Sequence, residues 1–255
     1  MMKNQKNPKR KQTSTESNQP NQSVDKSPSI PQRSKLKSFL KIVHRELNEK
    51  QNEFLKLVFD KDTKIIFVSG PAGSAKTFMS ILSALKMIND KKISDIIYIR
   101  SAVECSDARL GFLPGEVNEK MAPYIQPLVD KMSEFLSKSE IDMLIKEERI
   151  TSIPVGFLRG LNWNAKCIIS DESQNMSYKE LFTLITRIGE FSKVFILGDP
   201  DQSDIGNKSG FIKLISQFDD EESRENGIHI VKLTEDDIVR SGIVQFIIKK
   251  VKKSL

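Results

Sequence analysis

Five short runs of apolar residues predict a parallel sheet with helices between its strands. They are residues 65–68 (IIFV), 95–100 (DIIYIR), 165–170 (AKCIIS), 193–197 (KVFIL) and 227–233 (GIHIVKL). Runs that are apolar on consecutive positions are typical of strands covered on both faces. Apolar residues at helical spacing occur over residues 37–60, with a break expected near Asn48, and again from residue 76. The fold class predicted by this alternation is α/β.

The connection between the second and third predicted strands is unusually long. Residues 101–115 look irregular, and a mostly helical pattern then continues to about residue 148 despite Pro123 and Pro127. Connections in compact α/β domains are ordinarily short. We therefore expect a helical insert over about residues 105–160 that is functional or part of an interface.

The first predicted strand leads into a glycine-rich turn and then a helix, the order found in a phosphate-binding P-loop. Backbone N–H groups of the turn and the helix N-terminus would face the same anion. A strand–helix turn that binds nothing is the alternative. The turn comprises Gly70, Pro71, Ala72, Gly73, Ser74, Ala75, Lys76 and Thr77.

Two of these residues carry specific chemistry, and a third departs from the usual pattern. We expect Lys76 to reach the β- and γ-phosphates and the Thr77 hydroxyl to ligate Mg²⁺. Ala75 stands where the pattern has glycine. Its methyl group reduces clearance near the phosphates and causes strain if the local φ is positive.

Polar residues follow two of the later strands. Asp171 would hold Mg²⁺, directly or through water, and Glu172 would polarise the attacking water. An acidic helix start is the plain alternative, but the P-loop about 95 positions upstream favours a nucleotide site. Gln202, beyond the fourth strand, could sense the γ-phosphate and position the water.

Two further side chains have more than one interpretation. Gln51 is either a surface glutamine or, one short helix before the P-loop strand, a reader of the adenine edge. Arg240 is either a surface arginine or a finger that stabilises the transferring phosphate, a group often supplied in trans.

Composition separates residues 1–36 from the remainder. This segment has four prolines, no aromatic residue, and eight Lys and Arg against two acids, a net charge of +6. The whole chain is also +6, so residues 37–255 sum to zero. We expect a disordered basic tail before a single domain over residues 37–255. The tail either holds nucleic acid loosely or is a solvated arm without a partner.

Cysteine usage and hydropathy bear on the compartment. Cys105 and Cys167 are the two cysteines, and neither they nor the two histidines have metal-site spacing. This pattern favours a reducing, cytoplasmic setting, the host cytoplasm if the source is viral. No run of 18 apolar residues occurs and the N-terminus lacks a signal-peptide core, so we expect no membrane association.

Motifs distributed along the chain resemble those of the PhoH family, most of all its phage and viral branch. The resemblance extends over about residues 48–251. LGFLPG and EKMAPYIQPL make it specific, because generic P-loop ATPases lack them. The motifs are GPAGSAKT (70–77), IRSAVE (99–104), LGFLPG (110–115), EKMAPYIQPL (119–128), RG (159–160), SDESQN (170–175), TRIG (186–189), GDPDQ (198–202), KSG (208–210) and DIVR (237–240).

The resemblance implies one RecA-like P-loop ATPase domain related to the motor core of superfamily 1 helicases. Its five strands would lie in the order 5-1-4-3-2. It also implies ATP binding, Mg²⁺-dependent hydrolysis, adenine recognition by Gln51, and a homo-oligomeric ring, with a hexamer as one form. In such a ring Arg240 or another arginine would reach the neighbouring subunit's site.

The leading functional hypothesis is an ATPase that acts on single-stranded RNA or DNA, with RNA favoured. The alternative is a nucleotide-dependent switch or assembly protein, in which ATP orders the insert and hydrolysis is slow. A small-molecule kinase shares the P-loop but is disfavoured, because Glu172 and Gln202 suit hydrolysis better.

Overall fold

The computed structural model describes Leu36, residues 38–101 and 117–239, and a few positions near the C-terminus (242, 243, 246, 247 and 250). The expected tail before Leu36 lies outside these residues, as do Arg240 and most of the predicted closing helix.

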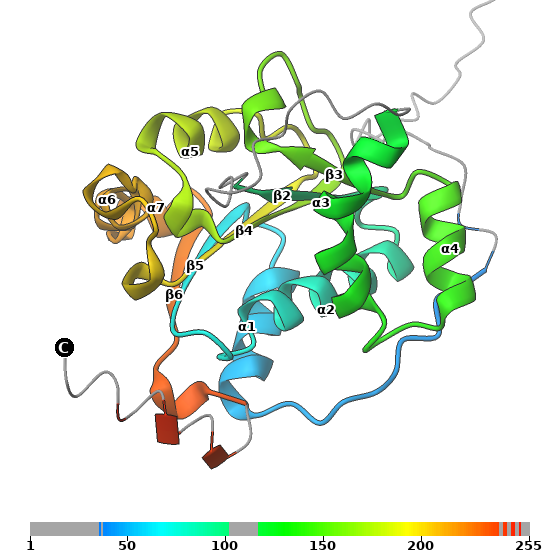
Figure 1. The fold of residues 1–255 in the computed structure, drawn as a ribbon, viewed down its shortest axis with the longest axis horizontal. Coiled ribbons are helices and arrows are strands. Elements are labelled where there is room, and N and C mark those ends of the chain that lie inside the picture. Colours follow the sequence, from blue (N-terminus) through cyan, green and yellow to red (C-terminus); the bar gives the residue numbers. More distant parts are fainter. Residues whose placement is uncertain are drawn as a thin grey trace, which may run out of the picture.

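In the described part of the chain, six parallel strands form one sheet in the order β3-β2-β4-β5-β1-β6 (Figure 1). Successive residues face opposite layers: Ile66 and Val68 belong to one apolar core, whereas Ile65 and Phe67 belong to the other. Burial on both faces is the reason that the four inner strands read as nearly continuous apolar runs. The strands are β1 (Ile65–Ser69), β2 (Asp95–Arg100), β3 (Ile150–Pro154), β4 (Lys166–Asp171), β5 (Lys193–Gly198) and β6 (Ile228–Lys232).

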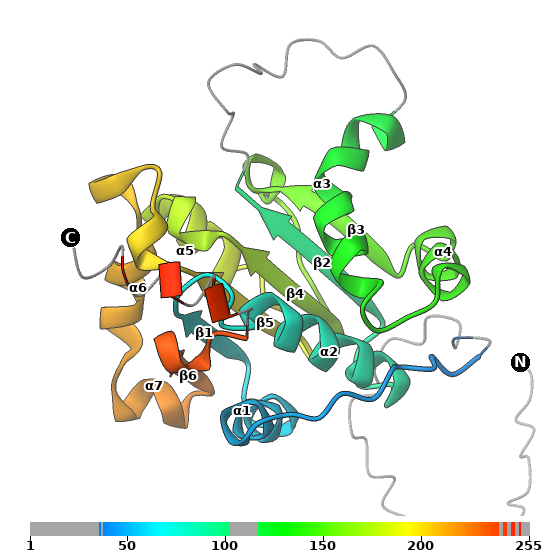
Figure 2. The same cartoon turned by 60° about the horizontal axis from the view of Figure 1, so that its bottom comes forward.

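Helices cover both faces of the sheet (Figures 1 and 2). One face packs against α1 (Glu49–Phe59), α2 (Lys76–Asn89), α3 (Val117–Met132) and α4 (Lys138–Lys146). The other face packs against α5 (Tyr178–Ile185) and α6 (Phe211–Phe218). The short α7 (Glu221–Glu225) precedes β6.

The sheet confirms the predicted α/β class and extends it by one strand. The five predicted strands have the order β6-β1-β5-β4-β2, as expected, but β3 lies outside β2 and makes the count of five wrong. The insert expected to be helical over about residues 105–160 therefore contains α3 and α4 but ends in a strand. β3 was missed because ITSIP alternates buried and half-buried residues at an edge and is not an apolar run.

Residues 38–48 form an extended segment, termed here the N-terminal strap, and the helix predicted over this stretch does not form (Figure 2). Its backbone is satisfied by other elements. The Leu40 N–H and C=O both bond the Asn89 side chain at 2.9 Å. The Val43 N–H donates to the Phe135 carbonyl at 2.9 Å. Buried Leu40 thus holds the strap against α2, and the helix begins only after Asn48.

Candidate nucleotide-binding site

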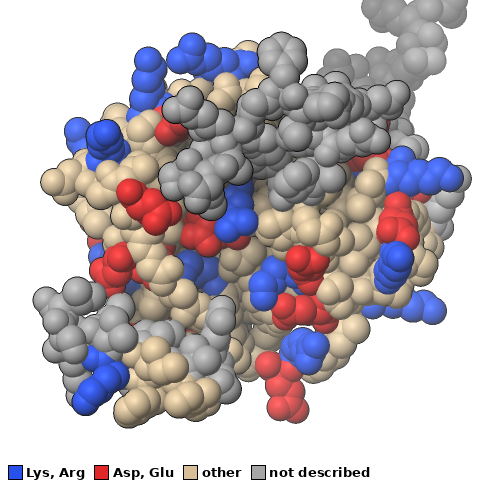
Figure 3. Space-filling model, viewed as in Figure 1, with Lys and Arg blue, Asp and Glu red and all other residues tan. Residues whose placement is uncertain are grey.

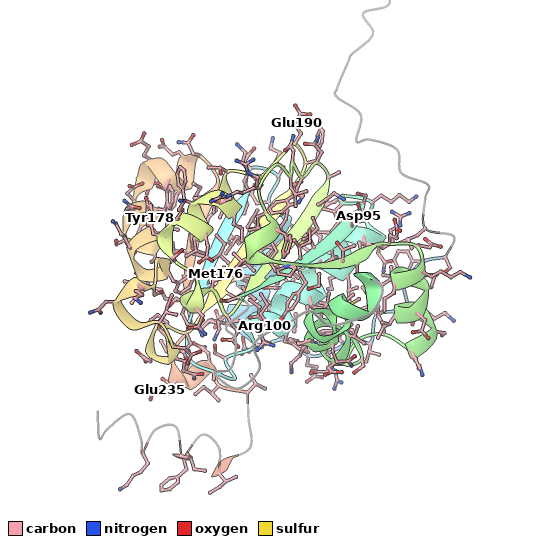
Figure 4. The ribbon with its side chains drawn as sticks, turned by 45° about the horizontal axis from the view of Figure 1, so that its top comes forward. Asp95, Arg100, Met176, Tyr178, Glu190 and Glu235 are labelled. Atoms are coloured by element: carbon pink, nitrogen blue, oxygen red, sulfur yellow. The ribbon has the colours of Figure 1, made fainter. Side chains whose placement is uncertain are left out.

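The carboxyl ends of the parallel strands meet at one edge of the sheet, where a cleft of about 950 Å³ opens. Figure 4 marks the two ends of β2, with Asp95 at the amino edge and Arg100 at the carboxyl edge. The P-loop and the ends of β2, β4 and β5 line the cleft, and the N-terminal strap and α3 contribute further walls. Open α/β sheets bind ligands at this edge.

The P-loop connects β1 to α2 and adopts a backbone that needs two left-handed residues. Gly73 has φ of 84°, and Ala75 has φ of 65° and ψ of 18°. Glycine adopts the first without cost, whereas an alanine in this conformation is strained. The strain that the sequence made conditional on a positive φ is therefore present at Ala75.

Lys76 opens α2, and its ammonium group lies inside the loop. Its Nζ donates to the Gly70 carbonyl at 2.7 Å and to the Pro71 carbonyl at 2.9 Å. Burial lowers the pKa of Lys76, and the carboxylates of Asp199, Asp171 and Glu172 oppose that shift. An ammonium group near three carboxylates can exchange its backbone partners when an anion such as phosphate enters.

Thr77 and Asp171, each predicted from the sequence as an Mg²⁺ ligand, are hydrogen-bonded to one another near the lysine. The Thr77 hydroxyl donates to the two Asp171 carboxylate oxygens at 3.2 and 3.1 Å. The Tyr98 hydroxyl donates to Asp171 Oδ2 at 2.8 Å. Burial and the neighbouring Asp171 charge raise the pKa of Tyr98 well above its ordinary value, so its phenol remains a donor.

This donor set fits Mg²⁺. The cation prefers oxygen ligands and is commonly held by one or two protein groups together with waters and phosphate oxygens. Thr77 and Asp171 supply a hydroxyl and a carboxylate within hydrogen-bond distance of one another. Among the described residues no cluster of three His, Cys, Asp or Glu side chains could hold a metal by itself.

Glu172 follows Asp171 in a left-handed conformation, with φ of 52°, and this backbone turns its side chain toward the cleft. Its Oε2 accepts a 2.7 Å hydrogen bond from Gln174 Nε2. Arg100 Nη2 lies 3.9 Å from its Oε1. The side chain remains 44% exposed, so water can reach the carboxylate that the sequence assigned to water activation.

A chain of hydrogen bonds links this glutamate to the P-loop. Buried Gln174 accepts the Asp199 N–H at 3.1 Å through its Oε1. Asp199 Oδ2 in turn accepts the Ala72 N–H at 3.0 Å. Gln174 Nε2 also lies 3.4 Å from the Gln202 carbonyl. The ends of β4 and β5 are thereby fixed relative to the P-loop.

Sequence reasoning gave no role to Tyr98, Gln174 or Asp199. For Asp199 a signal existed, since it is the first polar residue after β5 and lies within GDPDQ (198–202), the motif that contains Gln202. Tyr98 lies within an apolar run and resembles an ordinary core aromatic. Gln202 itself is exposed and lines the cleft.

Gln51 lines the cleft but also caps α1. Its Oε1 accepts the Asn48 N–H at 3.1 Å, while Asn48 Oδ1 accepts the Gln51 N–H at 2.9 Å. This reciprocal pair is a capping box. A bidentate pairing with adenine would need the same amide oxygen, so adenine recognition by Gln51 stays a prediction.

At the far side of the loop, the Val239 N–H donates to the Gly73 carbonyl at 3.0 Å, one residue before Arg240.

A family model described as PhoH-like protein matches residues 43–252. The chain belongs to the PhoH family. A PhoH-like protein of Mycobacterium tuberculosis is 36% identical over 189 residues, covering 72% of this chain and 51% of the relative. Protein PhoH of Escherichia coli K12 is 32% identical over 202 residues, covering 78% and 55%.

Similarity to solved structures is more distant. The large terminase of a thermophilic bacteriophage aligns with a TM-score of 0.47 at 12% identity, covering 78% of this chain and 49% of the terminase. The chain spans about half the length of the two curated relatives above. None of its described helices has the length and apolar character needed to cross a lipid bilayer.

Proposed function

We propose that this PhoH-family chain is an Mg²⁺-dependent ATPase. The observation that carries the proposal is the meeting of Thr77 and Asp171 beside Lys76, with Glu172 exposed in the same cleft. These four side chains come from two separate strand ends and lie in one cleft, which supports their proposed roles in phosphoryl transfer to water.

Each residue has a distinct task in this scheme. Lys76 and the N–H groups of the loop hold the β- and γ-phosphates, and Thr77 and Asp171 hold the metal. Bound Mg²⁺ neutralises charge on the phosphate oxygens. Glu172 accepts a proton from the attacking water, while Gln174 fixes the direction of its carboxylate. Gln202 positions the water, and Arg240 stabilises the developing charge, in a neighbouring subunit's site if the chain forms a ring.

We further propose that hydrolysis is coupled to single-stranded nucleic acid, with RNA favoured, in a homo-oligomeric ring built from a domain over residues 37–255. Support comes from the PhoH motifs. Basic and acidic side chains are interspersed over the visible part of the face in Figure 3. Contacts to the polymer would then depend on individual residues more than on a broad basic stripe.

A nucleotide-dependent switch is the second candidate. The specific observation in its favour is that α3, from the insert, contributes Asp130 and Lys131 to the wall of the cleft, and Glu134 follows just beyond the helix. A ligand in the cleft can therefore bias the position of the insert without rapid turnover. The strained Ala75 beside the phosphates is compatible with slow hydrolysis.

Steady-state ATP hydrolysis separates these candidates. The wild type and Glu172→Gln are compared with and without single-stranded RNA and DNA. Turnover that rises with polymer and is lost in Glu172→Gln supports the nucleic-acid-coupled ATPase. Turnover that is indifferent to both polymers favours the switch, and normal hydrolysis by Glu172→Gln contradicts the assignment of the base.

A further inference from the structure

We propose that Tyr98 is a positioning residue that fixes the metal-binding carboxylate of Asp171, an inference that rests on the ATPase function proposed above. Tyr98 lies in β2, which pairs with β3 on one side and β4 on the other. It is 1% exposed and packs in the apolar core beneath α2 and α3. Its ring therefore has little freedom, and its hydroxyl is held at one place.

Sheet register explains why that hydroxyl reaches Asp171. Tyr98 stands opposite Ile169 of β4, so Asp171 is the diagonal neighbour two residues further on the same face. Diagonal neighbours are within reach of an aromatic side chain. The 2.8 Å bond from the phenol to Asp171 Oδ2 spans this diagonal at the point where β4 enters the cleft.

The bond restrains the carboxylate at a position that no other fixed donor covers among the contacts described. The Glu172 N–H donates to Oδ1 at 3.1 Å, so the backbone holds one oxygen. Tyr98 holds the other. Thr77 bridges both oxygens, but in the proposed site its hydroxyl turns to the metal and cannot also orient Asp171. With Tyr98 in place, the carboxylate keeps its plane when Thr77 changes partner.

Removing such an outer partner of a metal ligand typically lowers metal affinity about 10–100-fold. The position is also distinct from the nucleotide contacts, because Tyr98 hydrogen-bonds Asp171 and no group of the P-loop among the described contacts. Loss of the Tyr98 hydroxyl should therefore change the Mg²⁺ affinity of the site without changing metal-free nucleotide binding. A tyrosine that only fills the core would affect stability alone.

Tyr98→Phe removes the hydroxyl and keeps the ring. The measurement is the affinity of a fluorescent ATP analogue titrated in EDTA and at a series of Mg²⁺ concentrations, together with the Mg²⁺ requirement of hydrolysis. We expect half-saturating Mg²⁺ to rise about 10–100-fold, with binding in EDTA unchanged. The matched control is Tyr178→Phe, which removes a phenol bonded to Gln217 at 3.1 Å, and it should leave both quantities unchanged.

The outcomes distinguish this inference from the function on which it rests. If half-saturating Mg²⁺ is unchanged in Tyr98→Phe but rises or is never reached in Asp171→Asn, the role of Tyr98 is overturned. The proposed ATPase function is then unaffected. No effect in Asp171→Asn contradicts the proposed metal site itself. If Tyr98→Phe does not fold, Tyr98→Met provides a second side chain without a hydroxyl for the same titration, and an unchanged requirement there overturns the inference equally.

Discussion

Two lysines at opposite edges of the sheet make nearly the same contacts. Lys76 donates to two backbone carbonyls at 2.7 and 2.9 Å, and Lys193, the first residue of β5, donates to the Asp60 and Thr63 carbonyls at 2.6 Å each. Burial lowers the pKa of both, that of Lys193 to about 8. By these measures alone the two sites are equivalent.

Their surroundings differ. Lys76 lines the cleft and has three carboxylates of the carboxyl edge around it. Lys193 is not among the residues that line the cleft, and its hydrogen bonds fix the turn between α1 and β1. A buried lysine with a lowered pKa is thus not in itself a mark of function. What indicates function at Lys76 is its position beside several carboxylates in an open cleft.

Lys76→Ala gives the largest expected effect. Hydrogen bonds to charged groups contribute about 1.5–3 kcal/mol each. The bound phosphates would lose more than one such hydrogen bond, so ATP affinity should fall at least about 100-fold. The Gly70 and Pro71 residues are buried and their carbonyls lose this donor, so we also expect a melting temperature about 2–10 °C lower. Titration of a fluorescent ATP analogue with parallel calorimetry measures both, and tight binding by the variant contradicts the P-loop assignment.

Glu172→Gln acts on one of the three carboxylates around Lys76. We expect turnover to fall about 10²–10⁴-fold, because the proposed general base is lost, while ATP binding persists. Single-turnover hydrolysis and equilibrium binding separate the two quantities. Glu190→Gln, a change at the opposite edge in Figure 4, is the matched control and should leave turnover unchanged.

The sequence alone could predict those parts of the site that lie on contiguous residues. The P-loop and the Asp171–Glu172 pair are recognisable because their chemistry lies on contiguous residues. The bonds made by Tyr98 and Asp199 join residues 73 and 127 positions apart in sequence, so only the register of the strands brings them together. The capping role of Gln51 was visible as Asn-x-x-Gln before an apolar helix.

The fold was likewise predictable where a local pattern of apolar residues encodes an element, and not where distant contacts decide the structure. The four inner strands are apolar on both faces and were found from that signal, and the edge strand β6 was found because IHIVK is mostly apolar. β3 at the edge alternates, and the N-terminal strap has helical spacing that tertiary contacts override. Leu40 and Val43 satisfy their backbone groups with α2 and with the turn after α3, which no local pattern encodes.

Lys193→Met tests the structural member of the pair. The Asp60 and Thr63 carbonyls lose their donor, so we expect a loss of about 1–3 kcal/mol and a melting temperature about 2–10 °C lower. ATP affinity should be unchanged. A large loss of nucleotide binding with the fold intact would contradict the distinction between the two lysines.

The same variant has a defined pH dependence. Lys193 titrates near pH 8 in the folded protein and near 10.5 in the unfolded chain. Between these values the unfolded chain binds more protons, so the contribution of this group to stability is complete above the unfolded pKa and is lost as pH falls through about 8. The stability difference between wild type and Lys193→Met should therefore widen from pH ~8 to pH ~10, as measured by chemical denaturation.

Ala75→Gly gives the smallest expected effect. It tests whether the left-handed alanine of the P-loop is strained and whether its methyl group limits turnover. Alanine in the left-handed region costs about 1–2 kcal/mol, and glycine relieves this while making the unfolded chain more flexible by about 0.4–1 kcal/mol. Net stability should rise by about 0–1.6 kcal/mol, and turnover should rise because the methyl group no longer limits clearance near the phosphates.

Ala84→Gly, inside the helix that Ala75 precedes, is the control that isolates backbone strain. Ala84 is fully buried inside α2 and is absent from the positive-φ residues, so glycine there gains no relief and costs about 1 kcal/mol or more. Calorimetry of the two variants compares one chemical change in two conformations. Equal destabilisation would mean that φ of 65° at Ala75 stores no strain. An unchanged turnover in Ala75→Gly would mean that the loop accommodates the methyl group.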